Sequence, residues 1–117
     1  MSQAEAVVAQ RKAELEDLTS QIEADIRRAT LDLSAAASQV DLAARNVVVT
    51  KEALGLTRQR FEAGVAESVE VVQAQEAVTT AELDYINGVF AHNLSKLTLA
   101  RATGQANEII GEFLKLP

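Results

Sequence analysis

The sequence predicts an all-α chain that folds as one long, coiled-coil-like antiparallel helical hairpin. Helix-favouring residues dominate its 117 positions, and its single proline is the last residue, so no proline interrupts a helix. Apolar residues recur at steps of three and four along two segments, as in coiled coils. Gly64 lies between these segments. We therefore expect one domain over residues 1–117, with a helix at about 5–62, a turn at 63–67 and a helix at about 68–103.

The first helix carries an apolar face, here named the inner stripe, which contains no charged residue. Its members are Leu15, Thr19, Ile22, Ile26, Ala29, Leu33, Ala36, Val40, Ala43, Val47, Thr50, Leu54, Thr57 and Phe61. From Ile26 onward, large residues alternate with small ones. A seven-residue repeat of this kind indicates packing against a second helix.

The second helix repeats the pattern. Its inner stripe is Val71, Ala74, Val78, Ala81, Tyr85, Gly88, His92, Ser95, Leu99 and Ala102. One antiparallel register sets large layers against large and small against small. Its pairs are Phe61 with Val71, Thr57 with Ala74, Leu54 with Val78, Thr50 with Ala81, Val47 with Tyr85, Ala43 with Gly88, Val40 with His92, Ala36 with Ser95, Leu33 with Leu99 and Ala29 with Ala102. We expect close helix packing to explain the glycine at Gly88, and His92, the single histidine, to fill a layer rather than bind a metal.

Glycine at the end of the first periodic segment predicts the turn. Gly64 suits the left-handed residue that commonly follows a helix C-terminus. Ser68 is expected to cap the next helix, and Glu70 falls in its first turn, where the helix dipole favours an anion. The turn would leave Val65 and Ala66 exposed at the tip.

Each helix has a further apolar face, here named the outer stripe, which a two-helix hairpin cannot bury. On the first helix it includes Ala35, Leu42, Val49, Ala53 and Leu56, and on the second Val69, Val72, Leu83, Ile86, Phe90 and Leu97. Helices in proteins gain most of their stability from packing, so the outer stripes predict another partner. Two partners fit: a second copy in a four-helix bundle, or neighbouring hairpins in a larger closed assembly.

The tail from Gly104 onward is apolar at Ile109, Ile110, Phe113, Leu114 and Leu116. We expect it to fold back as a short helix beside residues 15–26, because Leu15, Leu18 and Ile22 otherwise lack cover. The alternative is that it leads into structure outside this chain.

Several function classes are disfavoured. The net charge is −6, and no Lys/Arg cluster accompanies the few aromatic residues, so the chain is not expected to bind nucleic acid. The uncharged run 85–95 is shorter than the roughly 20 residues that cross a bilayer. No nucleophile–base pair, phosphate-binding loop or cofactor motif is present. We therefore expect no enzyme activity, no cofactor and no metal site.

The stretch "RFEAGVAESVEVVQAQ" and the helices around it resemble the repeat of TolC-like outer-membrane efflux proteins. The residues that carry the resemblance at the tip are Arg60, Phe61, Gly64, Ser68, Glu70, Val71, Val72, Ala74 and Gln75. The return helix is similar at Tyr85, Phe90, Asn93 and Gly104. The resemblance covers nearly the whole chain.

The resemblance implies a periplasmic segment of an outer-membrane exit duct, serving a tripartite efflux pump or a type I secretion system. Full-length family members are trimers, and for this chain it implies a dimer or a higher oligomer with like hairpins. Their hairpin tips meet a periplasmic adaptor protein, which here implies contacts at Arg60, Gly64, Val65, Ala66, Glu67 and Ser68. The acidic position that lines the aperture corresponds to Glu70.

The chain departs from the family in length. Full members have two such repeats, membrane strands and an export signal, so we expect this chain to be an excised segment or a truncated product. Two alternatives remain open. One is the hairpin of an adaptor protein, which would be flanked by β-rich segments, and the other is a coiled-coil scaffold with no transport role.

Overall fold

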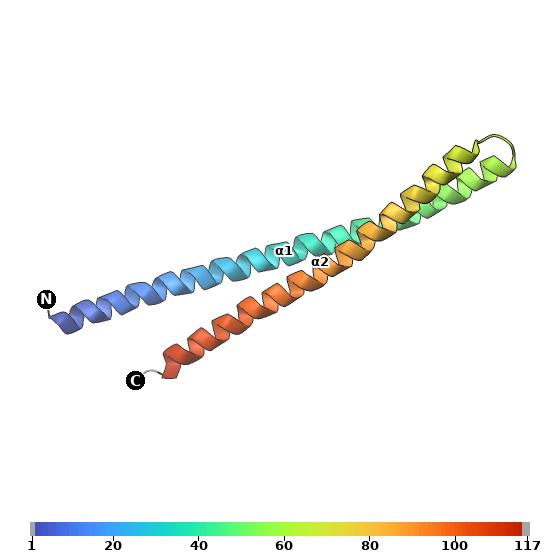
Figure 1. Ribbon diagram of the computed structural model, residues 1–117. Helices are drawn as coiled ribbons and strands as arrows, with labels where there is room; N and C mark the ends of the chain where they lie inside the picture. Colours follow the sequence, from blue (N-terminus) through green and yellow to red (C-terminus); the bar gives the residue numbers. More distant parts are fainter. Residues whose placement is uncertain (1, 116–117) are drawn as a thin grey trace. The chain divides into compact units, whose positions relative to one another are not determined.

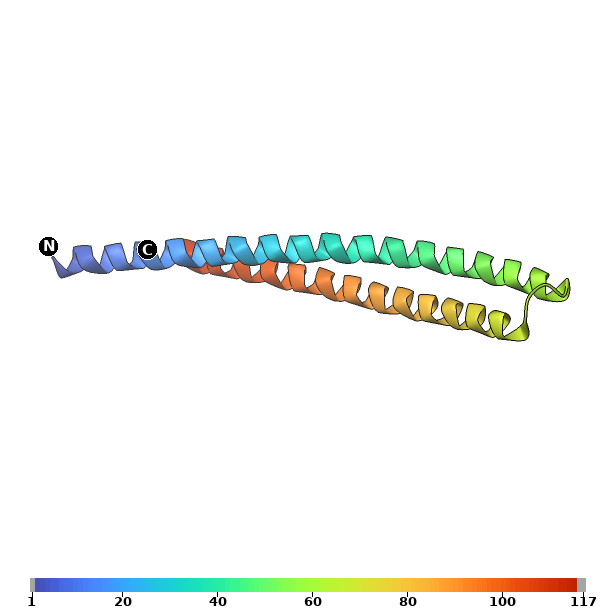
Figure 2. The same ribbon diagram turned by 90° about the horizontal axis from the view of Figure 1, so that it is seen from above.

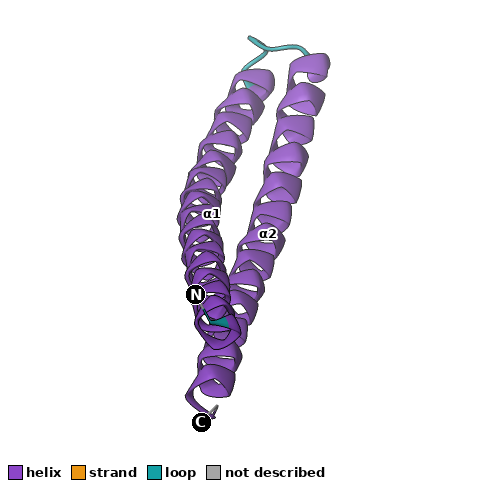
Figure 3. Cartoon of the chain, turned by 90° about the vertical axis from the view of Figure 1, so that its left-hand side faces the viewer, coloured by secondary structure: helices purple, strands orange, loops and turns teal. Residues whose placement is uncertain are grey.

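Two helices make up the part of the chain that the structure describes. The structure is a computed structural model that describes residues 2–115, apart from the side chains of Ile110 and residues 112–115. Helix α1 (Gln3–Glu62) is followed by α2 (Ser68–Lys115), and a turn at residues 63–67 joins them (Figures 1 and 3). The all-α class, the antiparallel hairpin and the position of the turn are confirmed.

Helix α1 begins two residues before the expected position. The backbone N–H of Glu5 donates to Oγ of Ser2 at 3.2 Å, and Ala6 N–H donates to the Ser2 carbonyl at 3.2 Å. Ser2 therefore caps the helix. The sequence "SQAE" has the spacing of a capping box, a Ser followed three residues later by a Glu, and this signal could have located the helix start.

Helix α2 does not end near residue 103, and the prediction of a separate folded-back tail is wrong. The helix continues to Lys115. Gly64 has the only positive φ among the described glycines, so Gly104 keeps a helical backbone. One glycine costs a helix about 1 kcal/mol relative to alanine, which the good helix formers after it can offset. The predicted contacts of Phe113, Leu114 and Leu116 lie outside the described side chains.

The chain divides into two compact units, both built from segments of α1 and α2. The turn unit is Ser34–Leu94, and the terminal unit combines residues 1–33 and 95–117. In the turn unit, α1 and α2 lie side by side and run in opposite directions (Figures 1 and 2). In the terminal unit, Ala29 and Ala106 are buried, and Ile22, Ile26 and Ile109 are half-buried.

Burial follows the predicted inner stripes. Every inner-stripe residue from Ile22 to Thr57 and from Val71 to Ala102 is half-buried or buried, except Tyr85, which is 39% exposed. The outlying members Leu15, Thr19 and Phe61 are exposed. Among the residues whose side chains the structure describes, only four alanines are less than about a tenth exposed: Ala29, Ala66, Ala81 and Ala106. Two helices cannot surround a large side chain, so the hairpin has a seam rather than a core.

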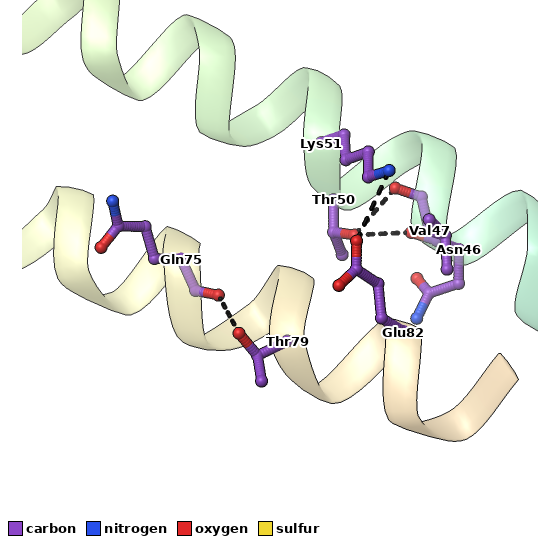
Figure 4. A network of polar contacts seen from close by, with 7 residues as sticks. All are labelled: Asn46, Val47, Thr50, Lys51, Gln75, Thr79 and Glu82. Atoms are coloured by element: carbon purple, nitrogen blue, oxygen red, sulfur yellow. Dashed lines mark hydrogen bonds and ion pairs between the residues drawn. The ribbon is translucent and has the colours of Figure 1, made fainter. Parts of the chain in front are cut away.

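Contacts between the helices of the turn unit fit the predicted register. Nζ of Lys51 lies 3.5 Å from Oε1 of Glu82, next to the predicted pair Thr50–Ala81 (Figure 4). The Thr50 hydroxyl forms its hydrogen bond within α1, since it donates to the carbonyl of Asn46 at 2.9 Å or of Val47 at 3.0 Å (Figure 4). A polar side chain can thus occupy the seam without an unsatisfied donor.

Candidate functional site

The turn closes α1 by a regular C-terminal motif. Gly64 has φ of 77°, and its N–H donates to the Phe61 carbonyl at 3.0 Å. The N–H groups of Val65 and Ala66 donate to the carbonyl of Arg60, at 2.8 Å and 3.2 Å. The bonds from Gly64 and Val65 form a Schellman motif, which satisfies carbonyls that the helix end would otherwise leave unpaired. The predicted role of Gly64 is confirmed.

The start of α2 differs from the expected cap by one residue. Ser68 is the first residue of the helix, and the cap position falls on Glu67. The Glu67 carbonyl accepts from the N–H of Glu70 at 3.1 Å. Glu70 lies in the first turn of α2, as predicted, where a carboxylate is favoured by the helix dipole.

The predicted tip residues are not all available to a partner. Arg60, Gly64, Glu67 and Ser68 are exposed, and Val65 is 69% exposed. Ala66 is buried, at 9% exposure, so the expectation that its side chain lies open at the tip is wrong. The reason is the turn itself, because the hydrogen bond from Ala66 N–H to Arg60 draws this residue back against the hairpin.

Arg60 and Glu70 face each other across the start and end of the turn. Nη1 of Arg60 lies 3.9 Å from Oε2 of Glu70, with the two side chains 57% and 44% exposed. Oε2 itself is buried and has no hydrogen-bond partner. The predicted aperture residue thus directs one carboxylate oxygen toward its own hairpin.

The outer stripes are exposed, as predicted. In the turn unit Phe90 is 69% exposed and Ile86 is 61% exposed. The other large members there are also exposed: Leu42, Val49 and Leu56 on α1, and Val69, Val72 and Leu83 on α2. Large apolar surface of this extent, repeated along both helices, indicates an interaction surface.

Two grooves at small layers were not predicted. In the turn unit a groove of about 430 Å³ lies at the Ala43–Gly88 layer, lined by Gln39, Leu42, Ala43, Asp84, Asn87, Gly88 and Ala91. In the terminal unit a groove of about 220 Å³ lies at the Ala29–Ala102 layer. The sequence held a signal for both grooves, namely small residues paired with small residues in the predicted register. Such layers leave space beside the seam.

The described residues form neither a metal-binding cluster nor a membrane-spanning helix. Among the side chains that the structure describes, no three from His, Asp or Glu gather as a group that could hold a metal ion. Neither α1 nor α2, as far as each is described, is apolar over a length that could cross a bilayer.

Comparison with known proteins gives one family. The sequence model of a family described as outer membrane efflux protein matches residues 1–105. The searches of curated proteins and of solved structures returned no match.

Proposed function

The chain belongs to the outer membrane efflux protein family, and we propose that it is a periplasmic helical hairpin of an exit duct, in a tripartite efflux pump or a type I secretion system. In this proposal the turn at 63–67 docks with a periplasmic adaptor protein, and the outer stripes pack against like hairpins. The role is structural and non-enzymatic.

The turn carries the docking part of the proposal. Its backbone is fixed by the positive φ of Gly64 and by the hydrogen bonds to Phe61 and Arg60. A preformed turn loses little conformational entropy on binding. It presents Val65 as an exposed apolar side chain, with the charged Glu67 nearby.

The outer stripes support assembly with like hairpins. Both helices of the turn unit carry exposed apolar residues at heptad spacing, and among the described side chains the only buried apolar ones are alanines. A hairpin with so little buried apolar surface gains stability when a neighbour covers its outer face. The two alternatives, an adaptor hairpin and a scaffold without a transport role, lack the support of the family match.

A photocrosslinking experiment tests the docking proposal. A photoreactive amino acid is placed at Val65 of the full chain, and purified hairpin domains of periplasmic adaptor proteins serve as the probe. We expect a crosslink from Val65. The matched control is Gln73, an exposed residue of α2 beyond the turn, from which no crosslink is expected.

Either of two outcomes contradicts docking through the turn. One is crosslinking that is equal at Val65 and Gln73, and the other is none at Val65 with any adaptor hairpin. Ala66 is a poor position for this test, since its buried side chain makes a substitution disturb the turn itself.

A further inference from the structure

Arg60 acts on both sides of the turn. Its main-chain carbonyl accepts the N–H groups of Val65 and Ala66, which closes the end of α1. Its guanidinium lies 3.9 Å from Oε2 of Glu70, in the first turn of α2. One residue therefore connects the end of the first helix, the turn and the start of the second helix.

The environment of Glu70 makes this ion pair different from an ordinary surface pair. Oε2 has no solvent access and no hydrogen-bond partner. A desolvated carboxylate oxygen without a hydrogen bond is costly unless a positive charge lies close. Among the described residues, the guanidinium of Arg60 is the cation found within 4.0 Å of it.

We infer that Arg60 is an internal counter-ion that holds Oε2 of Glu70 against the hairpin and stabilises the turn, so that this oxygen becomes available to a partner when the ion pair opens. Arg60 is then a positioning residue rather than a direct contact for a partner. The inference deepens the proposed function, since it concerns the state of the same turn before a partner arrives. Its test uses the chain alone, so docking and this stabilisation can fail independently.

Lys51 and Glu82 provide a matched comparison within the same unit. Their charged atoms also meet across the two helices, at 3.5 Å, and their side chains are 59% and 49% exposed. The Glu82 side chain is about as exposed as that of Glu70, which is 44% exposed. Removing either cation leaves a partly exposed carboxylate, but only at Glu70 is one oxygen known to be buried without a hydrogen-bond partner, so the loss of Arg60 is expected to cost more.

The experiment measures amide hydrogen exchange by NMR in four forms of the full chain: the parent, Arg60→Gln, Glu70→Gln and the double variant. In Arg60→Gln we expect the exchange of the Val65 and Ala66 amides to rise about fivefold, the factor that corresponds to roughly 1 kcal/mol. In the Glu70→Gln background the same substitution is expected to have little further effect, because no carboxylate then needs a counter-ion at this position. The amide of Ala81, a buried residue of α2 beyond its first turns, reports whether the chain has unfolded globally.

Two further variants separate charge from packing. Arg60→Lys keeps the positive charge and is expected to exchange close to the parent, whereas Arg60→Met keeps only the apolar stem and is expected to behave like Arg60→Gln. Lys51→Gln is expected to leave the Val65 and Ala66 amides unchanged. The inference is overturned if Arg60→Gln has the same effect with and without the Glu70 carboxylate, or if it has none.

Discussion

Gly88 of α2 faces Val40 of α1 closely enough that a β-carbon built on the glycine would lie 3.7 Å from Cγ2 and 3.9 Å from Cα of Val40. These are ordinary van der Waals separations. The helices are therefore near each other at Gly88, but the nearest residue is Val40, which the predicted register pairs with His92, and no atom of Ala43 lies within 4 Å of the added carbon. However, close packing does not by itself require glycine here, since alanine fits.

Gly88→Ala is consequently predicted to stabilise the chain. Glycine inside a helix costs roughly 0.5–1 kcal/mol relative to alanine, and the added methyl group meets Val40 without overlap. We expect the midpoint of urea unfolding, followed by circular dichroism, to rise accordingly. Gly55→Ala is the control, because its β-carbon meets nothing within 4 Å and the gain there reflects helix propensity alone.

Leucine in place of glycine is expected to destabilise the chain at Gly88 but not at Gly55. Gly88→Leu extends beyond a β-carbon that already contacts Val40, so we expect it to crowd the facing helix and destabilise the hairpin by about 1–3 kcal/mol. Gly55→Leu has no such neighbour and is expected to stabilise. Equal responses at the two positions would contradict the close approach of the helices at Gly88.

Gly64 and Gly104 are predicted to respond to alanine with opposite signs. Gly64 has φ of 77°, which costs an L-residue about 1–2 kcal/mol, so Gly64→Ala should destabilise the chain. Gly104 lies inside α2, and a β-carbon there meets nothing within 4 Å, so Gly104→Ala should gain up to about 1 kcal/mol. Thermal unfolding of both variants checks this, and a stabilising Gly64→Ala would argue against the left-handed turn.

The two helices and their pairing were predictable because the three-and-four spacing of apolar residues is a pattern shared by many residues. The inner stripes and their register depend on large and small residues alternating over both helices, so no single exception alters the result. The turn was predictable because Gly64 interrupts that period. The end of α2 was not, since Gly104 resembles a stop signal, and only the helix formers after it carry the chain to Lys115.

The candidate site was predictable in position but not in detail. The sequence indicates which residues lie at the turn, and Val65 is exposed as expected. The burial of Ala66 depends on the hydrogen bond that its N–H donates to Arg60, and that bond follows from the closed backbone of the turn. The contact between Arg60 and Glu70 requires two helix ends to meet, which no local pattern specifies.

The ion pair between Lys51 and Glu82 is predicted to contribute little to stability. Its atoms lie 3.5 Å apart, but both side chains are about half exposed, so water and salt screen the attraction. A double-mutant cycle with Lys51→Gln and Glu82→Gln should give a coupling of about 0.2–1 kcal/mol, and less at high salt. A coupling well above this range would mean that the pair is shielded from solvent, for instance by association of the chains.

Polar substitution on the outer stripe is predicted to reduce self-association and leave the hairpin folded. Ile86 and Phe90 are 61% and 69% exposed, so Ile86→Gln and Phe90→Gln remove apolar surface that the seam does not use. We expect the double variant to sediment as a smaller species than the parent at equal concentration, with unchanged helix content. The reason is that burial of a large apolar side chain between copies contributes about 1.5–3 kcal/mol.

An inner-stripe variant distinguishes this effect from general destabilisation. Val78 is half-buried at the seam, so Val78→Gln should lower the unfolding midpoint of the hairpin itself. The outer-stripe variant should instead lose the dependence of that midpoint on protein concentration, because association stabilises a folded chain by mass action. A parent chain that sediments as a monomer at all concentrations, with a midpoint independent of concentration, would contradict assembly through the outer stripe and leave its exposed residues to another partner.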